Sequence, residues 1–501
     1  MNPLKIIVTS KTNLANKYGK NFDKIKALLG KLIASDKKRG LTTQLVYIDD
    51  PASSKKAGLA KSVTITEKNC KTAIDTIYKK LQPAYIVIFG AQDIVPFQTL
   101  KNQLFEKPKE NDPDEFVPSD LPYACDKPYS TVITSFIAPT RVVGRIPDLP
   151  AKADVAYVRT LISNIIKSKP AAVKGYQDYF SITAQVWKGS TSQSLTNIFG
   201  NSKKLLSSPT AKTGGYTKTQ LKPLTHFINC HGALKAISYY GQKGKFYPDA
   251  LSSPDLTDTI SYGTLVAAEC CYGGQLLDPS DSGVSIANNY LGNNALAFIG
   301  SSTVAYGPAD GQGLADLICQ YFVINVHHGA SSGRALLEAR QKFLNASGPT
   351  LDPCELKTFA QFYLLGDPSI SLVETPETKE AFNTTANRRL NLVAKGMAFQ
   401  DMIAPPVKAS KFSKTKHKKH VADILGRTDF KNNEKEMVFE STLQTNGKTN
   451  STQKAMPLQG VRFRTFQKKS AVFHNGVPKY DILVVKENDE GILGWRVYSS
   501  K

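Results

Sequence analysis

Short apolar runs alternate with amphipathic stretches over the first 375 residues of the chain. The strand-like runs of the first half are Lys5–Ser10, Gln44–Asp49, Tyr85–Gly90 and Arg141–Pro147. Stretches with helical spacing of apolar residues lie between and after them, near Asn21–Ser35, Lys68–Leu81 and Ala151–Lys169. This alternation predicts an α/β fold built on open, mostly parallel sheets flanked by helices.

A second, similar unit begins near Tyr179. Its strand-like runs are Phe180–Val186, Thr225–Asn229, Thr264–Glu269 and Ala295–Ser301, and the segment Phe362–Val373 closes it. Its helical stretches are Ser192–Leu206, Gly311–Asn325 and Ser332–Leu344. Because a chain of 501 residues is too long for one hydrophobic core, we expect two adjacent α/β subdomains, over residues 1–175 and 176–375.

The pattern changes after residue 375. Residues 376–420 contain Pro405–Pro406 and the lysine-rich run Lys408–His420, which predicts a basic linker. The strand-like runs beyond it are Val461–Phe466, Tyr480–Val485 and Gly494–Ser499. Residues 421–501 are therefore expected to form a small, β-rich C-terminal domain.

Hydropathy and composition are those of a water-soluble protein, with 41% hydrophobic and 21% charged residues. No apolar run approaches the ~20 residues that a membrane span requires. The first residues hold only the short run Leu4–Val8, which is shorter than the apolar core of a secretory signal. We expect a cytoplasmic protein that does not associate with membranes.

Basic residues are in excess, and the net charge is +22. Residues 376–501 contribute half of this excess, with 23 Lys and Arg against 12 Asp and Glu. Such a surface favours an acidic partner or nucleic acid, but a solvated basic surface accounts for the charge equally well. Phe412 is the one Phe, Tyr or Trp in the run Lys408–His420, which gives little support to stacking on single-stranded nucleic acid.

Seven cysteines are scattered along the chain, an odd number without the spacing of a disulfide framework. The chain has no Cys-x-x-Cys pair and no adjoining histidine pair with zinc-ligand spacing. The sequence therefore predicts no metal site and no cofactor.

Two apolar strands end in residues that can carry chemistry. His231–Gly232 lie just past the run Thr225–Asn229, and Cys270–Cys271 follow the run Thr264–Glu269. Active sites of open parallel sheets form at the carboxyl ends of strands, so neighbouring strands would bring imidazole and thiol into one crevice. A histidine beside a thiol supplies the base that a cysteine nucleophile needs.

Each residue alone has a simpler interpretation. A His-Gly pair also occurs at His328–Gly329, between two helical stretches, where a loop or helix cap is expected. A buried cysteine is often just a small apolar residue of the core. The pairing of both motifs at strand ends, 40 residues apart and with histidine first, favours the catalytic interpretation.

These two blocks resemble those of the caspase-like cysteine peptidases, and further segments are similar to the gingipain family in particular. Those segments are Tyr85–Phe97, Asp120–Ala124, Val142–Pro147 and Phe362–Leu372. The resemblance covers roughly residues 80–375 and implies a caspase-like fold and a cysteine endopeptidase that needs no cofactor. Its substrates would be proteins or peptides.

The resemblance implies roles for individual residues. Cys271 would be the nucleophile, because Gly273 follows it by two positions as in the caspase pattern, and Cys270 is the alternative. His231 would be the general base, and the backbone N–H groups of Gly232 and Cys271 would hold the oxyanion.

Two further residues are candidates for substrate binding. By likeness to metacaspases, Glu269 would line the S1 pocket and select Arg or Lys at P1; a structural ion pair is the other interpretation. Tyr306 resembles the aromatic wall of the gingipain S1 pocket. Asp120 is a candidate for a residue that orients His231, with a surface turn as the alternative.

Two functions follow from these patterns. The first is a cysteine endopeptidase that works through a thioacyl intermediate. The second is an inactive caspase-like scaffold that binds an acidic partner or nucleic acid through its basic tail. The presence of histidine, cysteine and both glycines together favours the enzyme, because a scaffold does not require them.

Overall fold

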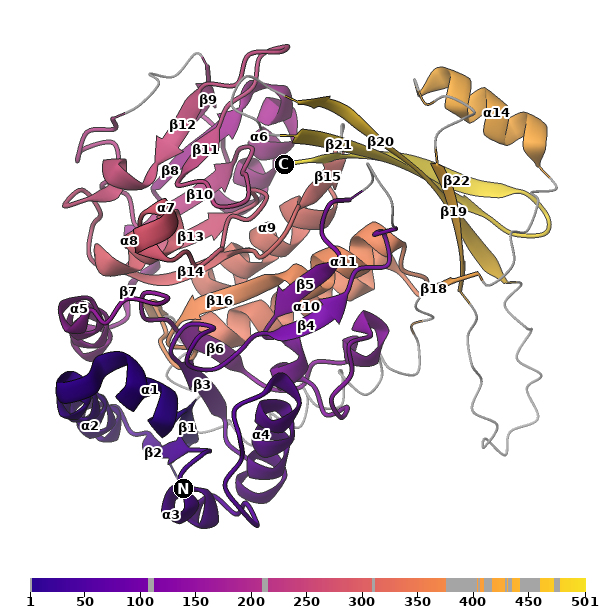
Figure 1. Ribbon diagram of the computed structural model, residues 1–501. Helices are drawn as coiled ribbons and strands as arrows, with labels where there is room; N and C mark the ends of the chain where they lie inside the picture. Colours follow the sequence, from indigo (N-terminus) through magenta and orange to yellow (C-terminus); the bar gives the residue numbers. More distant parts are fainter. Residues whose placement is uncertain are drawn as a thin grey trace.

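A ten-stranded sheet runs through the first two thirds of the computed structural model (Figure 1). In order across the sheet, its strands are β2 (Thr42–Tyr47), β1 (Leu4–Thr9), β3 (Tyr85–Phe89), β6 (Val143–Ile146), β16 (Phe362–Gly366), β14 (Ala295–Ser301), β13 (Thr264–Ala268), β10 (Thr225–Asn229), β8 (Tyr179–Ala184) and β9 (Leu205–Ser208). The structure describes residues 2–106, 112–209, 215–308, 311–374, 403, 406–409, 417–428, 430, 435–441, 460–472 and 478–501.

The sheet is parallel within each half and antiparallel where the halves meet. Strand β16 pairs in parallel with β6 and antiparallel with β14, so the strands on either side of this junction run in opposite directions. Because β16 comes late in the chain yet lies beside β6, the two halves share one continuous sheet. The predicted α/β fold with mostly parallel strands is confirmed.

Helices cover both faces of the sheet, which explains why its strands are nearly continuous apolar runs. The helices are α1 (Lys11–Tyr18), α2 (Phe22–Lys38), α3 (Pro51–Lys56), α4 (Glu67–Leu81), α5 (Val155–Lys167), α6 (Lys188–Phe199), α7 (Pro279–Ser282), α8 (Ile286–Gly292), α9 (Leu314–His327), α10 (Ser332–Ser347), α11 (Pro353–Gln361) and α14 (Lys418–Arg427). Helix α5 contacts both α2 and α8. Helix α9 contacts both α6 and α10.

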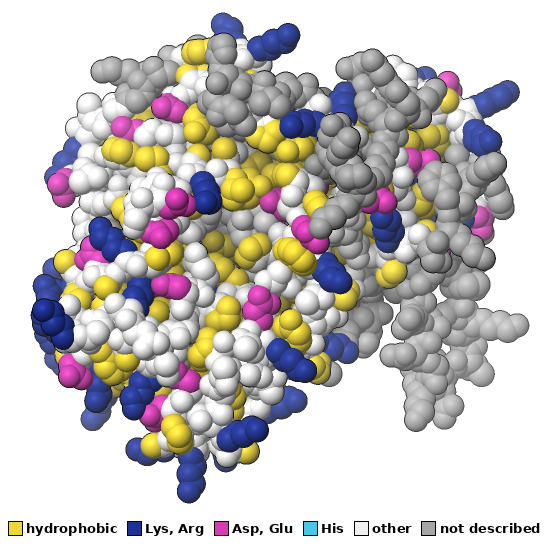
Figure 2. Space-filling view, viewed as in Figure 1, with side chains coloured by type: hydrophobic (Ala, Val, Ile, Leu, Met, Phe, Trp, Pro, Cys, Tyr) yellow, Lys and Arg dark blue, Asp and Glu magenta, His cyan; other side chains and the backbone are white. Residues whose placement is uncertain are grey.

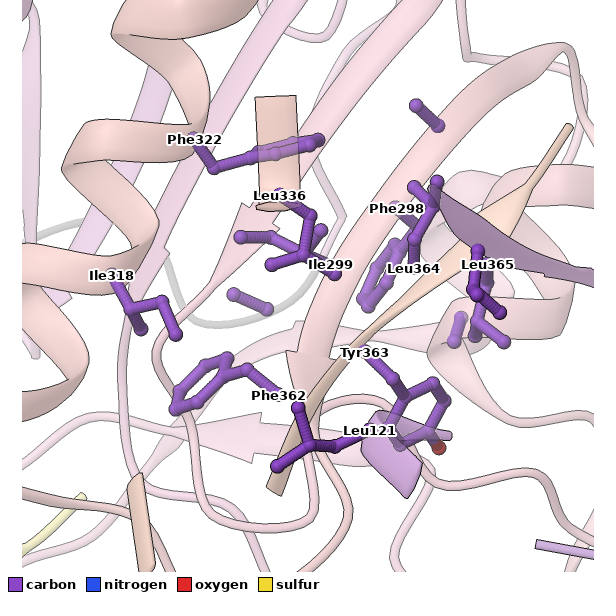
Figure 3. Close-up of a cluster of buried hydrophobic side chains, with 14 of the residues drawn as sticks. Leu121, Phe298, Ile299, Ile318, Phe322, Leu336, Phe362, Tyr363, Leu364 and Leu365 are labelled. Atoms are coloured by element: carbon purple, nitrogen blue, oxygen red, sulfur yellow. The ribbon is translucent and has the colours of Figure 1, made fainter. Parts of the chain in front are cut away.

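The core between β14, β16 and helices α9 and α10 contains large apolar side chains (Figure 3). Phe298 and Ile299 from β14 and Phe362 from β16 are completely buried there, together with Phe322 from α9. Burial of side chains of this size stabilises the fold by about 1.5–3 kcal/mol each. Strand β14 in turn pairs with β13, the strand that ends next to Cys270 and Cys271.

A second, antiparallel sheet contains most of the described C-terminal residues. In order across it, its strands are β15 (Tyr306–Pro308), β22 (Ile492–Ser500), β21 (Pro478–Glu487), β20 (Val461–Val472), β19 (Lys435–Ser441) and β18 (Val407–Lys408). Strand β15 belongs to the α/β part of the chain, so β22 attaches the C-terminal sheet to it. The β-rich character expected of the C-terminal region is confirmed.

Three short strand pairs complete the fold. They are β4 (Gln98–Lys101) with β5 (Phe116–Ser119), β7 (Ala171–Ala172) with β17 (Val373–Glu374), and β11 (Ser238–Tyr240) with β12 (Asp249–Ser252).

One predicted element is wrong in its extent. The helix expected over Ser192–Leu206 ends at Phe199, and Leu205 and Leu206 lie in strand β9. Gly200 stops the helix in a left-handed conformation with φ 77°, which glycine adopts at little cost. Much of the predicted linker 376–420 lies outside the described residues; within it, Lys408 belongs to β18 and Lys418 begins α14.

Candidate active site

Strands β10 and β13 are parallel neighbours, so their carboxyl ends lie at the same edge of the sheet. His231 and Gly232 follow β10, and Cys270 and Cys271 follow β13. The two chain segments approach so closely that a Cβ atom on Gly232 would lie 1.8 Å from the carbonyl oxygen of Cys271. Only glycine fits at this position.

The His231 ring is held between aromatic rings and one amide. The centroids of the Trp187 and Tyr247 rings lie 4.3 and 5.0 Å from that of the imidazole. Nε2 lies 2.7 Å from Oε1 of Gln242, whose own Nε2 donates to the carbonyl oxygen of Gly244. Because this amide oxygen can only accept, Nε2 carries the proton and Nδ1 is free to take one.

Burial sets the charge state of both candidate catalytic groups. His231 is 2% exposed, and desolvation lowers its pKa to about 3. Cys271 is 3% exposed, and desolvation raises the pKa of its thiol to about 12. The thiol donates to the carbonyl oxygen of Ala305, at 3.4 Å from Sγ. In this structure the pair is therefore a neutral imidazole and a neutral thiol.

Cys270 points to a different environment. It is completely buried, and its carbonyl oxygen accepts a hydrogen bond of 2.8 Å from the Ser301 hydroxyl. Desolvation raises its thiol pKa well above the ordinary value, and the nearby Cys230 adds to the effect. Cys270 is thus part of the core beneath the strand ends.

The carbonyl oxygen of Lys501 lies against the backbone of both strand ends. The Cys271 N–H donates to it at 2.9 Å, and the Gly232 N–H donates at 3.4 Å. Two backbone donors directed at one carbonyl oxygen beside a cysteine have the geometry that an oxyanion hole requires. These are the same two N–H groups that the sequence suggested for this role.

The Lys501 side chain enters a closed acidic pocket. Its Nζ lies 2.6 Å from Glu269 Oε2, forms a second ion pair with Asp316, and lies 5.6 Å from the centroid of the Trp187 ring. All three charged side chains are completely buried. Gly307 makes room for the lysine, because a Cβ atom there would lie 2.0 Å from Lys501 Cε.

Charge holds this pocket together despite its burial. Desolvation alone would lower the pKa of Lys501, but Asp316 and Glu269 outweigh it and raise that pKa. Desolvation raises the pKa of Glu269, and Asp316 adds to this while Lys501 opposes it. Among the described residues, Glu269 Oε1 has no hydrogen-bond partner. The ammonium group of Lys501 therefore offsets part of the cost of burying these two acidic side chains.

Tyr306 lies in strand β15, where its backbone pairs with that of Ser500. Its hydroxyl donates to Asp112 at 3.0 Å, and Asp112 and Asp114 both form ion pairs with Lys357. Asp114 also accepts from the Tyr272 hydroxyl at 2.7 Å. Tyr306 thus takes part in a polar cluster beside the site.

The sequence of this region matches one family model. The model of peptidase family C25 covers residues 5–373, which is well over half of the chain.

The chain belongs to peptidase family C25.

This is the gingipain family of the caspase-like clan, whose members are cysteine-type endopeptidases. The suspected relationship and the expected enzyme class are therefore confirmed. None of the curated proteins compared with the chain matches it.

The structure of the C25 peptidase brings the predicted residues His231, Gly232, Glu269 and Cys271 around Lys501. Asp120 is engaged elsewhere, in an ion pair with Arg145 in which both side chains are buried. Sequence reasoning missed Gln242, Asp316 and Lys501. Asp316 has the position of an ordinary helix-capping acid, and it does accept from the Gly313 N–H at 3.3 Å.

Within the described part of the C25 peptidase, no group of three or more His, Cys, Asp or Glu side chains could hold a metal ion. None of the described helices combines the length and apolarity needed to cross a membrane.

Proposed function

We propose that this C25 peptidase cleaves peptide bonds after Lys or Arg, with Cys271 as nucleophile and His231 as general base. The observation that carries the proposal is the position of Lys501. Its carbonyl oxygen accepts from the N–H groups of Cys271 and Gly232, while its ammonium group lies between Glu269 and Asp316. A P1 lysine of a substrate would make the same two sets of contacts.

In the proposed reaction, the Cys271 thiol gives its proton to Nδ1 of His231 and the sulfur attacks the scissile carbonyl carbon. The carbonyl oxygen becomes an oxyanion, held by the two backbone N–H groups. When the C–N bond breaks, His231 returns the proton to the leaving amine and a thioester to Cys271 remains. Water, deprotonated by His231, then hydrolyses this thioester and frees the thiol.

Gln242 takes the part of a positioning residue in this scheme. Its Oε1 accepts the Nε2 proton of His231, which leaves Nδ1 as the ring nitrogen that can accept from a thiol. A neutral amide does not stabilise an imidazolium as a carboxylate would. The base is therefore oriented by Gln242 but not made more basic by a negative charge.

Basic P1 specificity is supported by two carboxylates at the end of one narrow pocket. A single ammonium group leaves Glu269 Oε1 without a partner among the described residues. The planar guanidinium of arginine has five N–H donors and could pair with that oxygen as well. We propose that the pocket accepts both basic side chains and rejects acidic ones.

The test is labelling with peptide acyloxymethyl ketones that carry Arg, Lys, Asp or Asn at P1, followed by mapping of the modified residue. Covalent modification of Cys271 by the Arg and Lys reagents is the expected result. The Cys271→Ala variant is the control for labelling elsewhere. Modification of another cysteine, or a preference for the Asp reagent, would contradict the proposal.

A scaffold that binds acidic partners is the second candidate, because the net charge is +22. In Figure 2, lysine and arginine side chains project from separate points of the visible face, with acidic side chains among them. Basic side chains scattered in this way favour solubility or weak, non-specific attraction of anions over one defined binding interface. Binding of a polyanion by the Cys271→Ala variant would test this role independently of catalysis.

We also propose a cytoplasmic setting. The support is that all seven cysteines are free thiols, as expected of a protein in a reducing compartment. Retention of activity in a glutathione buffer at cytosolic potential is the expected result.

A further inference from the structure

Strand β22 reaches the active site as an extended strand. Ser500, Ser499 and Tyr498 pair antiparallel with Tyr306, Gly307 and Pro308 of β15. The Lys501 N–H donates to the carbonyl oxygen of Ala305 at 2.9 Å, which continues the same ladder by one residue. Figure 1 shows this end of the chain next to β15, at the edge of the α/β unit.

Residues Tyr498–Lys501 make both main-chain and side-chain contacts of the kind that hold an extended peptide. Main-chain hydrogen bonds to an exposed strand are the general means of holding an extended peptide, and pockets for side chains add selectivity. Here the strand is β15, the pocket contains Glu269 and Asp316, and the carbonyl oxygen of Lys501 lies in the oxyanion hole. Further from the cysteine, the Tyr498 hydroxyl donates to Asp352 at 2.7 Å.

We propose that the end of β22 is a built-in occupant of the substrate cleft, with Tyr498–Lys501 in positions P4 to P1, and that it blocks the enzyme until it withdraws. The inference rests on the proposed function of Cys271 and of the acidic pocket. It adds a regulatory role for the C-terminal sheet, and it identifies an extended peptide ending in a basic residue as the class of ligand that displaces it.

Withdrawal breaks only one end of the C-terminal sheet. Tyr498–Ser500 pair with β15, and Tyr498 and Ser499 also pair with Ile482 and Asp481 of β21, whereas Ile492–Val497 pair with β21 alone and can stay in place. Release of the last four residues would thus free the edge of β15 and the acidic pocket together. It would also admit water to His231 and Cys271, which are 2% and 3% exposed with the strand in place.

The experiment compares the full-length wild type with two variants that cannot seat the strand. Lys501→Glu places a negative charge against Glu269 and Asp316, and deletion of residues 499–501 removes the occupant itself. Lys204→Ala is the control, because this residue is a basic side chain that is 60% exposed and pairs with Asp178, away from the strand end. Each protein is treated with iodoacetamide, and the modification of Cys271 is followed by mass spectrometry.

Iodoacetamide is small and needs no pocket, so its rate reports only whether the cleft is open. We expect Cys271 to react roughly tenfold faster or more in both variants than in the wild type and the control, because removal of the ion pairs shifts the population toward the open state. Equal rates in all four proteins would overturn the inference.

A second reagent separates this inference from the proposed function. The acyloxymethyl ketone of acetyl-Tyr-Ser-Ser-Lys requires both an open cleft and a working site. Faster reaction with both reagents in the variants is the expected result. Faster alkylation without any reaction of the ketone would uphold the blocked cleft and contradict the peptidase assignment.

Fluorescence gives a readout that does not depend on chemistry at Cys271. The chain has two tryptophans, so Trp495→Phe leaves Trp187 as the single emitter. Lys501 Nζ lies 5.6 Å from the centroid of the Trp187 ring. Addition of the peptide acetyl-Tyr-Ser-Ser-Arg should change this emission in the Trp495→Phe protein, but not after the further change Glu269→Gln with Asp316→Asn. No change in either protein would contradict displacement of the strand.

Discussion

The two adjacent cysteines at the end of β13 differ in what their backbones contact. The Cys271 N–H donates to the carbonyl oxygen of Lys501, whereas the Cys270 carbonyl accepts from Ser301 in the core. Cys271→Ala is therefore expected to abolish peptidase activity, and Cys270→Ala to retain most of it. The measurement is kcat/KM on a fluorogenic peptide with P1 Lys. Activity that survives in Cys271→Ala but is lost in Cys270→Ala would reverse the assignment.

The acidic pocket makes a separate prediction about specificity. Glu269→Gln and Asp316→Asn each remove one charge-assisted contact to a P1 cation, which is worth about 1.5–3 kcal/mol. We expect kcat/KM for P1 Lys and Arg peptides to fall accordingly in a protein that lacks residues 499–501, where Lys501 does not compete for the pocket, with no gain for P1 Asn. Asp281→Asn, at a carboxylate that is 61% exposed, is the control. Faster cleavage of P1 Asp than of P1 Arg by the wild type would refute the pocket assignment.

At the scale of elements, the hairpin β4–β5 is joined to the active-site edge by one buried cation. Lys357 of α11 forms ion pairs with Asp112 and Asp114, which lie in the hairpin loop. Desolvation raises the pKa of Asp112 to about 6, although Lys357 opposes this. Removal of the cation would leave two neighbouring carboxylates in the interior.

Lys357→Met is therefore expected to lower the free energy of unfolding by about 3–5 kcal/mol, the usual cost of breaking a buried ion pair on one side. Lys235→Gln is the matched control, because its partner Asp281 and the lysine itself are 61% and 65% exposed. The control should cost at most about 1 kcal/mol. Urea unfolding followed by circular dichroism measures both. Equal effects would mean that the cluster does not stabilise the hairpin.

The strand ends were predictable from the sequence, because β10 and β13 are short strand-like runs with apolar centres, followed by His-Gly and by Cys with two later glycines. Parallel pairing then places their ends at one edge. Strand β15 was not predictable, because three residues are too few for a period to show. Asp316 and Lys501 are 185 residues apart, so no local pattern could have revealed that they meet in one pocket. Gln242 lies in a loop, and the spacing of apolar residues does not predict where loop side chains lie.

The whole α/β unit depends on a strand that arrives late in the chain. Strand β16 joins the two halves of the sheet, and the buried Lys5 of β1 forms ion pairs with Asp36 and with Asp367, directly after β16. A fragment of residues 1–175 would lack both β16 and Asp367. The neighbouring subdomains expected from the sequence are thus connected through their hydrogen bonds and their charges.

We therefore expect the halves to unfold together. Fragment 1–175 should fail to form a stable fold, and Asp367→Asn in the full chain should lower a single thermal transition for the whole α/β unit. Calorimetry together with limited proteolysis measures this. Two transitions, with only one of them shifted by Asp367→Asn, would show that the halves are independent.

The pairing of β22 with β15 has a consequence for kinetics. A tethered competitor acts as though it were present at a local concentration of the order of millimolar for a short connection. An external peptide of equal intrinsic affinity, supplied at micromolar concentration, would then fill roughly one cleft in a thousand. The wild type should therefore show a high apparent KM but an ordinary kcat. A substrate chain that is held against the enzyme has a high local concentration at the cleft, so it would be cleaved in preference to free peptides.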